Sequence, residues 1–355
     1  MTPTFDKIHL KFKFNSNKYT FKDLKEVAYS FVKEGDEFEK NIGDFFLDWL
    51  DDKPYIETKT SGSTGVQKVI RLSKQAMVNS AIATGDYFNL KPGDSALHCL
   101  PCNYIAGKMM MVRALILGLE VDVIKPSSAP IFSTKKRYDF SAMVPLQLKN
   151  SLKNLQHINT VIVGGASVSH KLIEDLKSLK TTVYETYGMT ETVSHIAVRQ
   201  LNSLKPSQTN YFKTLPDIEI SQDARNCLVV NAPKLSDEVV VTNDIVELKS
   251  ETQFKWLGRF DNVINSGGIK LFPEQIEVKL QNRIRRRFFI TSEKDEVLGE
   301  KVVLVLEDES NVLDKSYFKD LDKFEIPKKV YSVSKFSETS TGKVQRQKTF
   351  LEAKA

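Results

Sequence analysis

The chain has 355 residues, of which 41% are hydrophobic and 27% are charged, and its formal net charge is +6. This length suffices for two or three domains with a sizeable apolar core, and the weak positive charge suits an anionic small ligand while giving no support for nucleic-acid binding. Three cysteines cannot form a disulfide framework, and the sequence shows neither a secretory signal nor an apolar stretch of the ~20 residues that a membrane span needs, so we expect a cytoplasmic protein without a membrane span.

The first part of the chain alternates short apolar runs with helix-like segments. A strand at 54–58 leads into a loop rich in glycine and hydroxyl groups, a strand at 68–72 leaves that loop, and a helix with Ser73 as its N-cap follows at 73–90. Later apolar runs, most of them separated by helical segments, lie at 95–101, 119–126, 140–145, 160–166 and 182–188. This alternation predicts an α/β fold of layered subdomains with parallel strands.

The pattern changes at about residue 210, after which β-like runs follow one another without intervening helices. We expect a small β subdomain at about 205–258, inside a large N-terminal domain at 1–260. Residues 261–355 mix a helix at 272–284 with further strands, and we expect them to form a small, mobile α+β domain. Fewer than 60 residues precede the glycine-rich loop, so the first subdomain is expected to be small.

The stretch TKTSGSTGVQKVIRLS, at 58–73, has the composition of a phosphate-binding loop. Glycines allow backbone N–H groups to approach a phosphate closely, the hydroxyls are neutral donors, and Lys68 adds a positive charge. The spacing Gly62-x-x-Gly65-x-x-Lys68 fits neither the Walker loop nor the dinucleotide fingerprint. Without further motifs, the same residues could also form a Ser/Gly-rich turn with a purely structural role.

Three further motifs follow in order: YETYGMTET at 184–192, GRFDNVINSGGIKLFPEQIE at 258–277 and TSTGKVQR at 339–346. Each is weak by itself, but their order and separation resemble the adenylate-forming superfamily of acyl-CoA synthetases, adenylation domains and luciferases. The resemblance spans residues 58 to 346. Within the superfamily, the sequence most resembles the ligases that act on o-succinylbenzoate in menaquinone biosynthesis.

The resemblance implies a role for each matching residue. The β- and γ-phosphates of ATP would be held by Thr60, Ser61, Gly62, Ser63, Thr64, Gly65 and Lys68, with Gln67 standing where the family usually has proline. Adenine and ribose would contact Gly164, Gly165, Ala166, Tyr187, Gly188, Asp244 and Arg259. Thr190 would lie near the α-phosphate, and Glu191 would be the carboxylate ligand of Mg²⁺. Asp261 matches the hinge, and Gly267, Gly268 and Lys270 would face the site during thioester formation.

Lys343 matches the lysine of the family's C-terminal loop. When a carboxylate attacks the α-phosphorus, negative charge builds on the reacting oxygens, and a lysine delivered by domain closure stabilises that charge at the reacting moment. The implied reaction uses ATP and Mg²⁺ to form an acyl-adenylate, and a thiol, with coenzyme A as the expected co-substrate, then displaces AMP. The small domain would rotate between the two steps.

The acyl pocket is expected to include Tyr104, Gly107, Lys108 and His195. An aromatic wall beside a cation suits an aromatic acid with a second anionic group, whose charge Lys108 or Arg113 would neutralise. Surface exposure of Lys108 and a purely structural role for His195 are open alternatives. Two other functions also stay open: an enzyme that loads an aryl acid onto a carrier protein, and a non-catalytic adenylate-binding sensor. The oligomeric state is open, a homodimer included.

Overall fold

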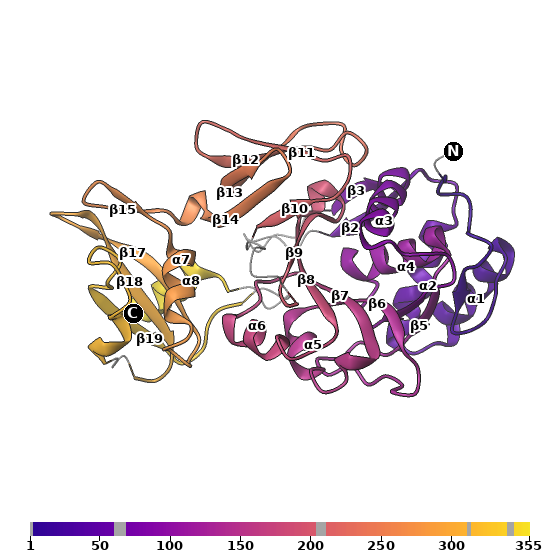
Figure 1. Ribbon diagram of the computed structural model, residues 1–355, viewed down its shortest axis with the longest axis horizontal. Helices are drawn as coiled ribbons and strands as arrows, with labels where there is room; N and C mark the ends of the chain where they lie inside the picture. Colours follow the sequence, from indigo (N-terminus) through magenta and orange to yellow (C-terminus); the bar gives the residue numbers. More distant parts are fainter. Residues whose placement is uncertain (1–2, 60–68, 204–210, 311–313, 339–343) are drawn as a thin grey trace.

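The computed structural model describes residues 3–59, 69–203, 211–310, 314–338 and 344–355. The strands in these ranges form a large sheet of 12 strands, a smaller sheet of five and a two-stranded hairpin. Figure 1 shows the large sheet and its helices at one end of the molecule and the smaller sheet at the other.

The large sheet has the strand order β1-β5-β4-β6-β7-β8-β9-β10-β14-β13-β12-β11. Its strands are β1 (Lys13–Phe14), β4 (Ser95–His98), β5 (Glu120–Val123), β6 (Tyr138–Met143), β7 (Ile158–Val163), β8 (Thr182–Gly188), β9 (His195–Gln200), β10 (Phe212–Thr214), β11 (Glu219–Gln222), β12 (Cys227–Asn231), β13 (Val240–Ser250) and β14 (Gln253–Arg259). The helices of this part are α1 (Phe21–Glu34), α2 (Glu37–Trp49), α3 (Lys74–Phe88), α4 (Ile105–Leu117), α5 (Pro145–Asn150) and α6 (His170–Leu176). The hairpin consists of β2 (Tyr55–Lys59) and β3 (Val69–Ser73).

From β1 to β8 all neighbouring strands of the sheet are parallel, as the alternating pattern predicts. Successive side chains of these strands enter different cores. Ala96 and Ile162 pack with helices α3 and α4, whereas Leu97 and Val161 pack with α5 and α6. The parallel strands therefore carry helices on both faces, which explains their nearly continuous apolar sequences. The expected N-cap is also present, since Ser73 Oγ accepts a hydrogen bond of 3.3 Å from the backbone N–H of Ala76.

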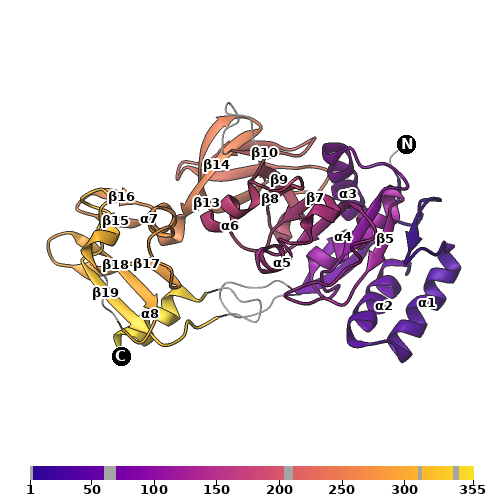
Figure 2. The same cartoon turned by 60° about the horizontal axis from the view of Figure 1, so that its bottom comes forward.

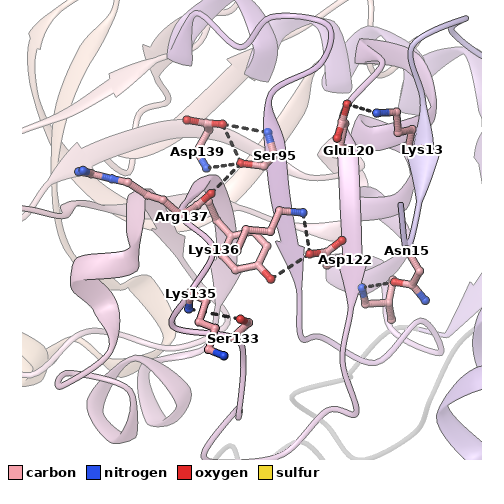
Figure 3. A network of polar contacts seen from close by, with 12 residues as sticks. Lys13, Asn15, Ser95, Glu120, Asp122, Ser133, Lys135, Lys136, Arg137 and Asp139 are labelled. Carbon is pink, nitrogen blue, oxygen red and sulfur yellow. Dashed lines mark hydrogen bonds and ion pairs between the residues drawn. The ribbon is translucent and has the colours of Figure 1, made fainter. Parts of the chain in front are cut away.

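Polar side chains tie the parallel strands together near their starts (Figure 3). Asp139 of β6 accepts hydrogen bonds from the backbone N–H (2.9 Å) and the hydroxyl (2.8 Å) of Ser95 of β4. Lys136 forms an ion pair of 2.7 Å with Asp122 of β5. These contacts fix the amino-terminal edge of the sheet, so that the opposite edge is left for ligands, as is usual in α/β folds.

The β-like runs beyond residue 205 form the antiparallel half of the same sheet. Strand β9 pairs with β8 on one side and with β10 on the other, so the ladder continues without a break from the parallel into the antiparallel half. The two runs predicted at 238–244 and 245–250 are a single strand, β13. This half has its own apolar cluster, which includes Ile196, Phe212 and Phe254.

The smaller sheet has the order β16-β15-β18-β17, with β19 paired to β18. Its elements are β15 (Ile264–Ser266), β16 (Ile269–Leu271), α7 (Pro273–Leu280), β17 (Phe288–Asp295), β18 (Gly299–Glu307), β19 (Lys329–Val333) and α8 (Arg346–Lys354). Ile276 of α7 belongs to one apolar cluster, whereas Phe350 of α8 packs on a second cluster with Phe289. Figure 2 shows this α+β unit beside the large sheet. The predicted fold class, layered α/β with an α+β carboxyl-terminal part, is confirmed, while the domain boundary at 260–261 stays a prediction.

The two parts touch through helix α7. Gln275 Nε2 donates a hydrogen bond of 2.8 Å to the carbonyl oxygen of Leu257 in β14, and Gln281 Oε1 accepts one of 3.4 Å from the backbone N–H of His170 in α6. Among the described helices, none has both the length and the apolar character needed to cross a bilayer.

Candidate active site

The hairpin β2–β3 carries the glycine-rich loop. Lys59 pairs with Val69 in an antiparallel register, so the two strands bring the ends of the loop side by side. This agrees with the two flanking strands expected from the sequence. The predicted phosphate-binding residues Thr60, Ser61, Gly62, Ser63, Thr64, Gly65 and Lys68 lie outside the described residues, and their role stays a prediction.

The predicted adenine segment, Gly164 to Ala166, directly follows β7 at the carboxyl-terminal edge of the parallel strands. Gly165 has φ +85°, a left-handed conformation that favours glycine. Just after this segment, the backbone N–H of Val168 donates a hydrogen bond of 3.1 Å to Oε1 of Glu185 in β8. Glu185 is in turn ion-paired with Arg199. A buried ion pair therefore supports the turn on which adenine is predicted to lie.

The predicted adenine and ribose side chains contact each other directly. Tyr187, near the end of β8, donates a hydrogen bond of 2.7 Å from its hydroxyl to Asp244 Oδ2 in β13. Burial and the neighbouring carboxylate raise the pKa of Tyr187, so its hydroxyl stays protonated and remains a donor. Arg259 Nη1 lies 3.8 Å from Asp244 Oδ1, and its Nη2 donates to Asp261 at 3.0 Å. The structure thus brings Tyr187 together with Asp244 and Arg259, which lie more than 50 residues further along the chain.

The motif Thr190–Thr192 forms a short 3-10 helix between β8 and β9. Thr192 is buried and its hydroxyl donates to backbone carbonyls of the same turn, whereas Glu191 is exposed. Gly188 starts this turn against the backbone of His195. Among the described residues no group of three His, Cys, Asp or Glu gathers that could hold a metal ion alone. The role of Glu191 as a carboxylate ligand of Mg²⁺ stays a prediction.

A buried arginine lies directly behind this turn. Arg113 of α4 is 2% exposed, and its guanidinium donates to Thr84 Oγ1 (3.3 Å), Ser194 Oγ (3.0 Å) and His195 Nδ1 (3.3 Å). All three acceptors are neutral, and among the described residues no carboxylate forms an ion pair with Arg113. Desolvation lowers the pKa of Arg113 to about 9, so the group still carries its charge at pH 7.

His195 completes this cluster. Since arginine has no acceptor, its contact assigns Nδ1 of His195 as the acceptor and places the ring proton on Nε2. Burial and the adjacent guanidinium hold the pKa of His195 well below its usual value, so the ring is neutral. Its Nε2 is buried without a hydrogen-bond partner among the described residues. Arg113 and His195 therefore offer two donors from one cluster.

The other predicted acyl-pocket residues lie around the start of α4. Tyr104 is the exposed N-cap residue. Gly107 packs so closely on Pro101 that a Cβ atom would lie 2.2 Å from its carbonyl oxygen. Lys108 is buried, not on the surface, and its Nζ donates to the carbonyl oxygen of Glu57 in β2 at 3.3 Å. Because Lys108 and Arg113 are five residues apart on one helix, they lie on different faces of α4. Only Arg113 contacts His195.

Two buried groups at the end of β4 are inert. Cys102 Sγ lies 3.3 Å from His98 Nε2, which could suggest a reactive thiol–imidazole pair. Burial raises the pKa of Cys102 to about 12 and lowers the pKa of His98 to about 4. Both groups are therefore neutral at pH 7, and neither a thiolate nor an imidazolium is available.

The carboxyl-terminal unit carries the remaining predicted residues. Asp261 lies in a short 3-10 helix, Phe260–Asn262, directly after β14. The exposed Gly267 and Gly268 form the turn between β15 and β16, and the exposed Lys270 lies in β16. Lys343 lies outside the described residues. Immediately after it in the chain, Arg346 forms hydrogen bonds of 2.6 and 2.8 Å to both carboxylate oxygens of Glu277 in α7.

Sequence reasoning missed two groups of residues. The first is the pair of hydroxyl acceptors of Arg113, Thr84 and Ser194. The second is Trp256, whose Nε1 donates a hydrogen bond of 3.0 Å to Asp244 Oδ1. No local sequence pattern indicates that contact.

Comparisons with known proteins agree with the superfamily predicted from the motifs. A family described as AMP-binding enzyme matches residues 50–223. A 2-succinylbenzoate–CoA ligase of Staphylococcus epidermidis is 28% identical, and the match covers 81% of this chain and 68% of the ligase. The chain thus matches about two thirds of the length of that relative.

Solved structures agree as well. An acyl-CoA synthetase (AMP-forming)/AMP-acid ligase II-like protein of Dyadobacter fermentans is 34% identical and has a TM-score of 0.62; the match covers 93% of this chain and 98% of that one. An O-succinylbenzoate coenzyme A synthetase of Bacillus subtilis, solved with ATP and magnesium ion, has a TM-score of 0.72 at 20% identity, covering 83% of this chain and 69% of that one, which supports the fold alone. From its motifs, its fold and its full-length relative, this chain belongs to the AMP-binding enzymes, the family of AMP-forming acyl-CoA synthetases within the adenylate-forming superfamily.

Proposed function

We propose that this protein is an ATP-dependent acid–CoA ligase that activates an aromatic acid carrying a second carboxylate, most specifically 2-succinylbenzoate. The products would be the acyl-CoA thioester, AMP and pyrophosphate. The ligase that matches 81% of the chain supports the substrate, and the motif residues of the adenylate-forming superfamily support the reaction.

One observation in particular supports a diacid. Arg113 is a buried cation whose described partners are all neutral. Keeping an unpaired charge in the interior is unfavourable, and proteins normally pair such a charge or hydrogen-bond it fully. An arriving carboxylate would pair with the guanidinium and could also accept the Nε2–H of His195. The protein would then distinguish a diacid from a monoacid by whether this charge is neutralised.

The chain's own residues would perform the remaining tasks. Tyr187, Asp244 and the 164–166 turn would orient the nucleotide, and Arg113 would hold one carboxylate of the acid so that the other reaches the α-phosphorus. Mg²⁺, held by Glu191 and phosphate oxygens, would supply positive charge to the triphosphate. An oxygen of the reacting carboxylate forms the new bond to the α-phosphorus as the bond to pyrophosphate breaks, and Lys343 would neutralise the charge that builds there. The thiol of CoA then attacks the acyl carbon, its proton passes to solvent, and AMP leaves.

The test is AMP and pyrophosphate release with ATP, Mg²⁺, CoA and 2-succinylbenzoate. Two monoacids serve as matched controls: 3-benzoylpropionate lacks the ring carboxylate, and 2-butanoylbenzoate lacks the chain carboxylate. We expect the diacid to have the highest kcat/KM. Activity with only one of the monoacids would identify which carboxylate is activated.

Three results would contradict the proposal. Equal turnover of the diacid and one monoacid would remove the second carboxylate from recognition. ATP-dependent loading of a phosphopantetheinyl carrier protein, with release of AMP and without transfer to CoA, would replace CoA as the acceptor. Tight nucleotide binding without AMP release from any acid would favour the sensor.

A further inference from the structure

A β-bulge determines which way Trp256 points. Strands β13 and β14 pair Asp244 with Arg259, but further along they pair Val246 with Trp256, so Leu257 is an extra residue in β14. Residues directly opposite each other share a face of the sheet, and residues two apart on one strand share a face as well. The bulge therefore brings Trp256 to the same face as Asp244. An unbroken register would place Trp256 on the other face.

On that face, two neutral donors hold the Asp244 carboxylate. Trp256 Nε1 donates to Oδ1 at 3.0 Å, and the Tyr187 hydroxyl donates to Oδ2 at 2.7 Å. Asp244 is 8% exposed, so these bonds form in a largely desolvated setting. A carboxylate has about four acceptor positions, two on each oxygen. One position on each oxygen is filled, and one on each oxygen is left for a ligand.

We propose that Trp256 is a positioning residue that orients Asp244 to accept both hydroxyls of a ribose. With one donor on each oxygen, the carboxylate plane cannot rotate, and its two remaining acceptor positions face a pair of neighbouring hydroxyls. The inference rests on the proposed function only in placing the nucleotide at Asp244, and it is independent of which acid is activated.

The chemistry of the neighbours favours Trp256 for this role. Indole N–H is a donor only, so it cannot compete with Asp244 as an acceptor for ribose hydroxyls. Arg259 lies 3.8 Å from the same oxygen and its side chain is 43% exposed, so its hold on the carboxylate plane is weak. Trp256 also packs against the cluster of Phe212 and Phe254. If packing were its only role, phenylalanine would replace it without effect on ribose recognition.

The experiment is isothermal titration calorimetry with AMP, 2′-deoxy-AMP and 3′-deoxy-AMP, none of which requires an acid. For Trp256→Phe we expect about tenfold weaker AMP binding, as for the loss of one hydrogen bond to a charged group, and a smaller loss for at least one deoxy analogue. The preference for AMP over that analogue would fall at least about threefold. Tyr211→Phe is the matched control, since it removes an aromatic donor to Glu247, also on β13, and should change none of the three affinities.

Equal weakening of AMP and both analogues, or no weakening, would overturn the inference. Intrinsic fluorescence supplies a second test, because the chain contains only two tryptophans, Trp49 and Trp256. If Trp256→Phe does not fold, Trp49→Phe leaves Trp256 as the sole emitter. Its emission should shift with AMP and shift less with the deoxy analogues. An emission that AMP leaves unchanged would also overturn the inference.

Discussion

Replacing Arg113 by methionine should separate diacid from monoacid activation. The substitution removes the guanidinium and keeps an unbranched apolar side chain of similar length in α4. Within the described ranges of the chain, the partners of the guanidinium are all neutral and lie at 3.0 to 3.3 Å. A diacid supplies the missing negative charge, whereas a monoacid leaves the charge unpaired.

The magnitude follows from the burial of the site. Truncating one partner of a desolvated, hydrogen-bonded charge pair costs about 2–5 kcal/mol, so kcat/KM for 2-succinylbenzoate should fall roughly 30- to 5,000-fold. The monoacid that keeps the activated carboxylate but lacks the other one forms no ion pair with Arg113. Its kcat/KM should therefore change by no more than about threefold. The two acids must therefore be compared in the same variant.

The thermal stability of Arg113→Met should be maintained or increased, although its activity with the diacid falls. Desolvation lowers the pKa of Arg113 from 12.5 to about 9, and at 1.36 kcal/mol per pKa unit this corresponds to a cost on the order of 5 kcal/mol for keeping the charge inside the ligand-free protein. Arg113→Met removes that cost while it also removes three hydrogen bonds. We expect a Tm no lower than that of the wild type.

The assay is continuous detection of pyrophosphate, with thermal unfolding followed in parallel. Lys108→Met is the control, because its ammonium group contacts the carbonyl of Glu57 on another face of α4. A similar loss of kcat/KM for diacid and monoacid in Arg113→Met would refute the assignment, and so would a diacid-selective loss in Lys108→Met alone. A diacid-selective loss in Lys108→Met alone would mean that Lys108, the other cation suggested by the sequence, binds the second carboxylate.

Three further predictions concern other parts of the chain. Lys343→Ala should abolish adenylate formation yet largely spare thioester formation from preformed acyl-adenylate, because its charge is needed only at the phosphorus; equal loss of both half-reactions would contradict this. Arg346→Met should destabilise the protein by about 3–5 kcal/mol in chemical denaturation, because it leaves the Glu277 carboxylate buried without its bidentate partner; a change within about 0.5 kcal/mol would exclude that role. Acidification should lower the unfolding free energy through His98, because its imidazole binds a proton below about pH 6.5 in the unfolded chain and only near pH 4 in the folded protein. Between these two pH values the unfolding free energy should fall by up to about 1.4 kcal/mol per pH unit. His98→Asn should flatten this dependence of the unfolding free energy on pH.

The sequence predicts the parallel half of the fold well, because its signals are local. Apolar runs that end in Pro or Gly mark the strands, and Ser73 marks the start of a helix. The antiparallel half is predicted as a compact β subdomain. Its strand order is harder to predict, because β10 pairs with β14 through residues about 40 apart, as in Lys213 and Gln253, and a local pattern does not reveal such a pairing.

For the site, the motifs indicate which residues act but not what surrounds them. Tyr187 and Asp244 could be placed near one nucleotide from the resemblance, and the structure joins them at 2.7 Å. The contact of Trp256 depends on a register shift at Leu257. An alternating pattern has no way to show such a shift, so period-two reasoning puts this indole on the wrong face. Likewise, an arginine in an apolar helix is visible in the sequence, but its lack of an acidic neighbour is not.

The uninterrupted ladder of the large sheet has a consequence for how the protein melts. Because β9 is shared by both halves, neither half can separate without breaking hydrogen bonds of the other. The two halves should therefore behave as one cooperative unit, even though each has its own apolar cluster. A nucleotide bound by Tyr187 and Asp244 would contact both halves of the sheet. Its binding would therefore raise the resistance of both halves to heat and to proteases together.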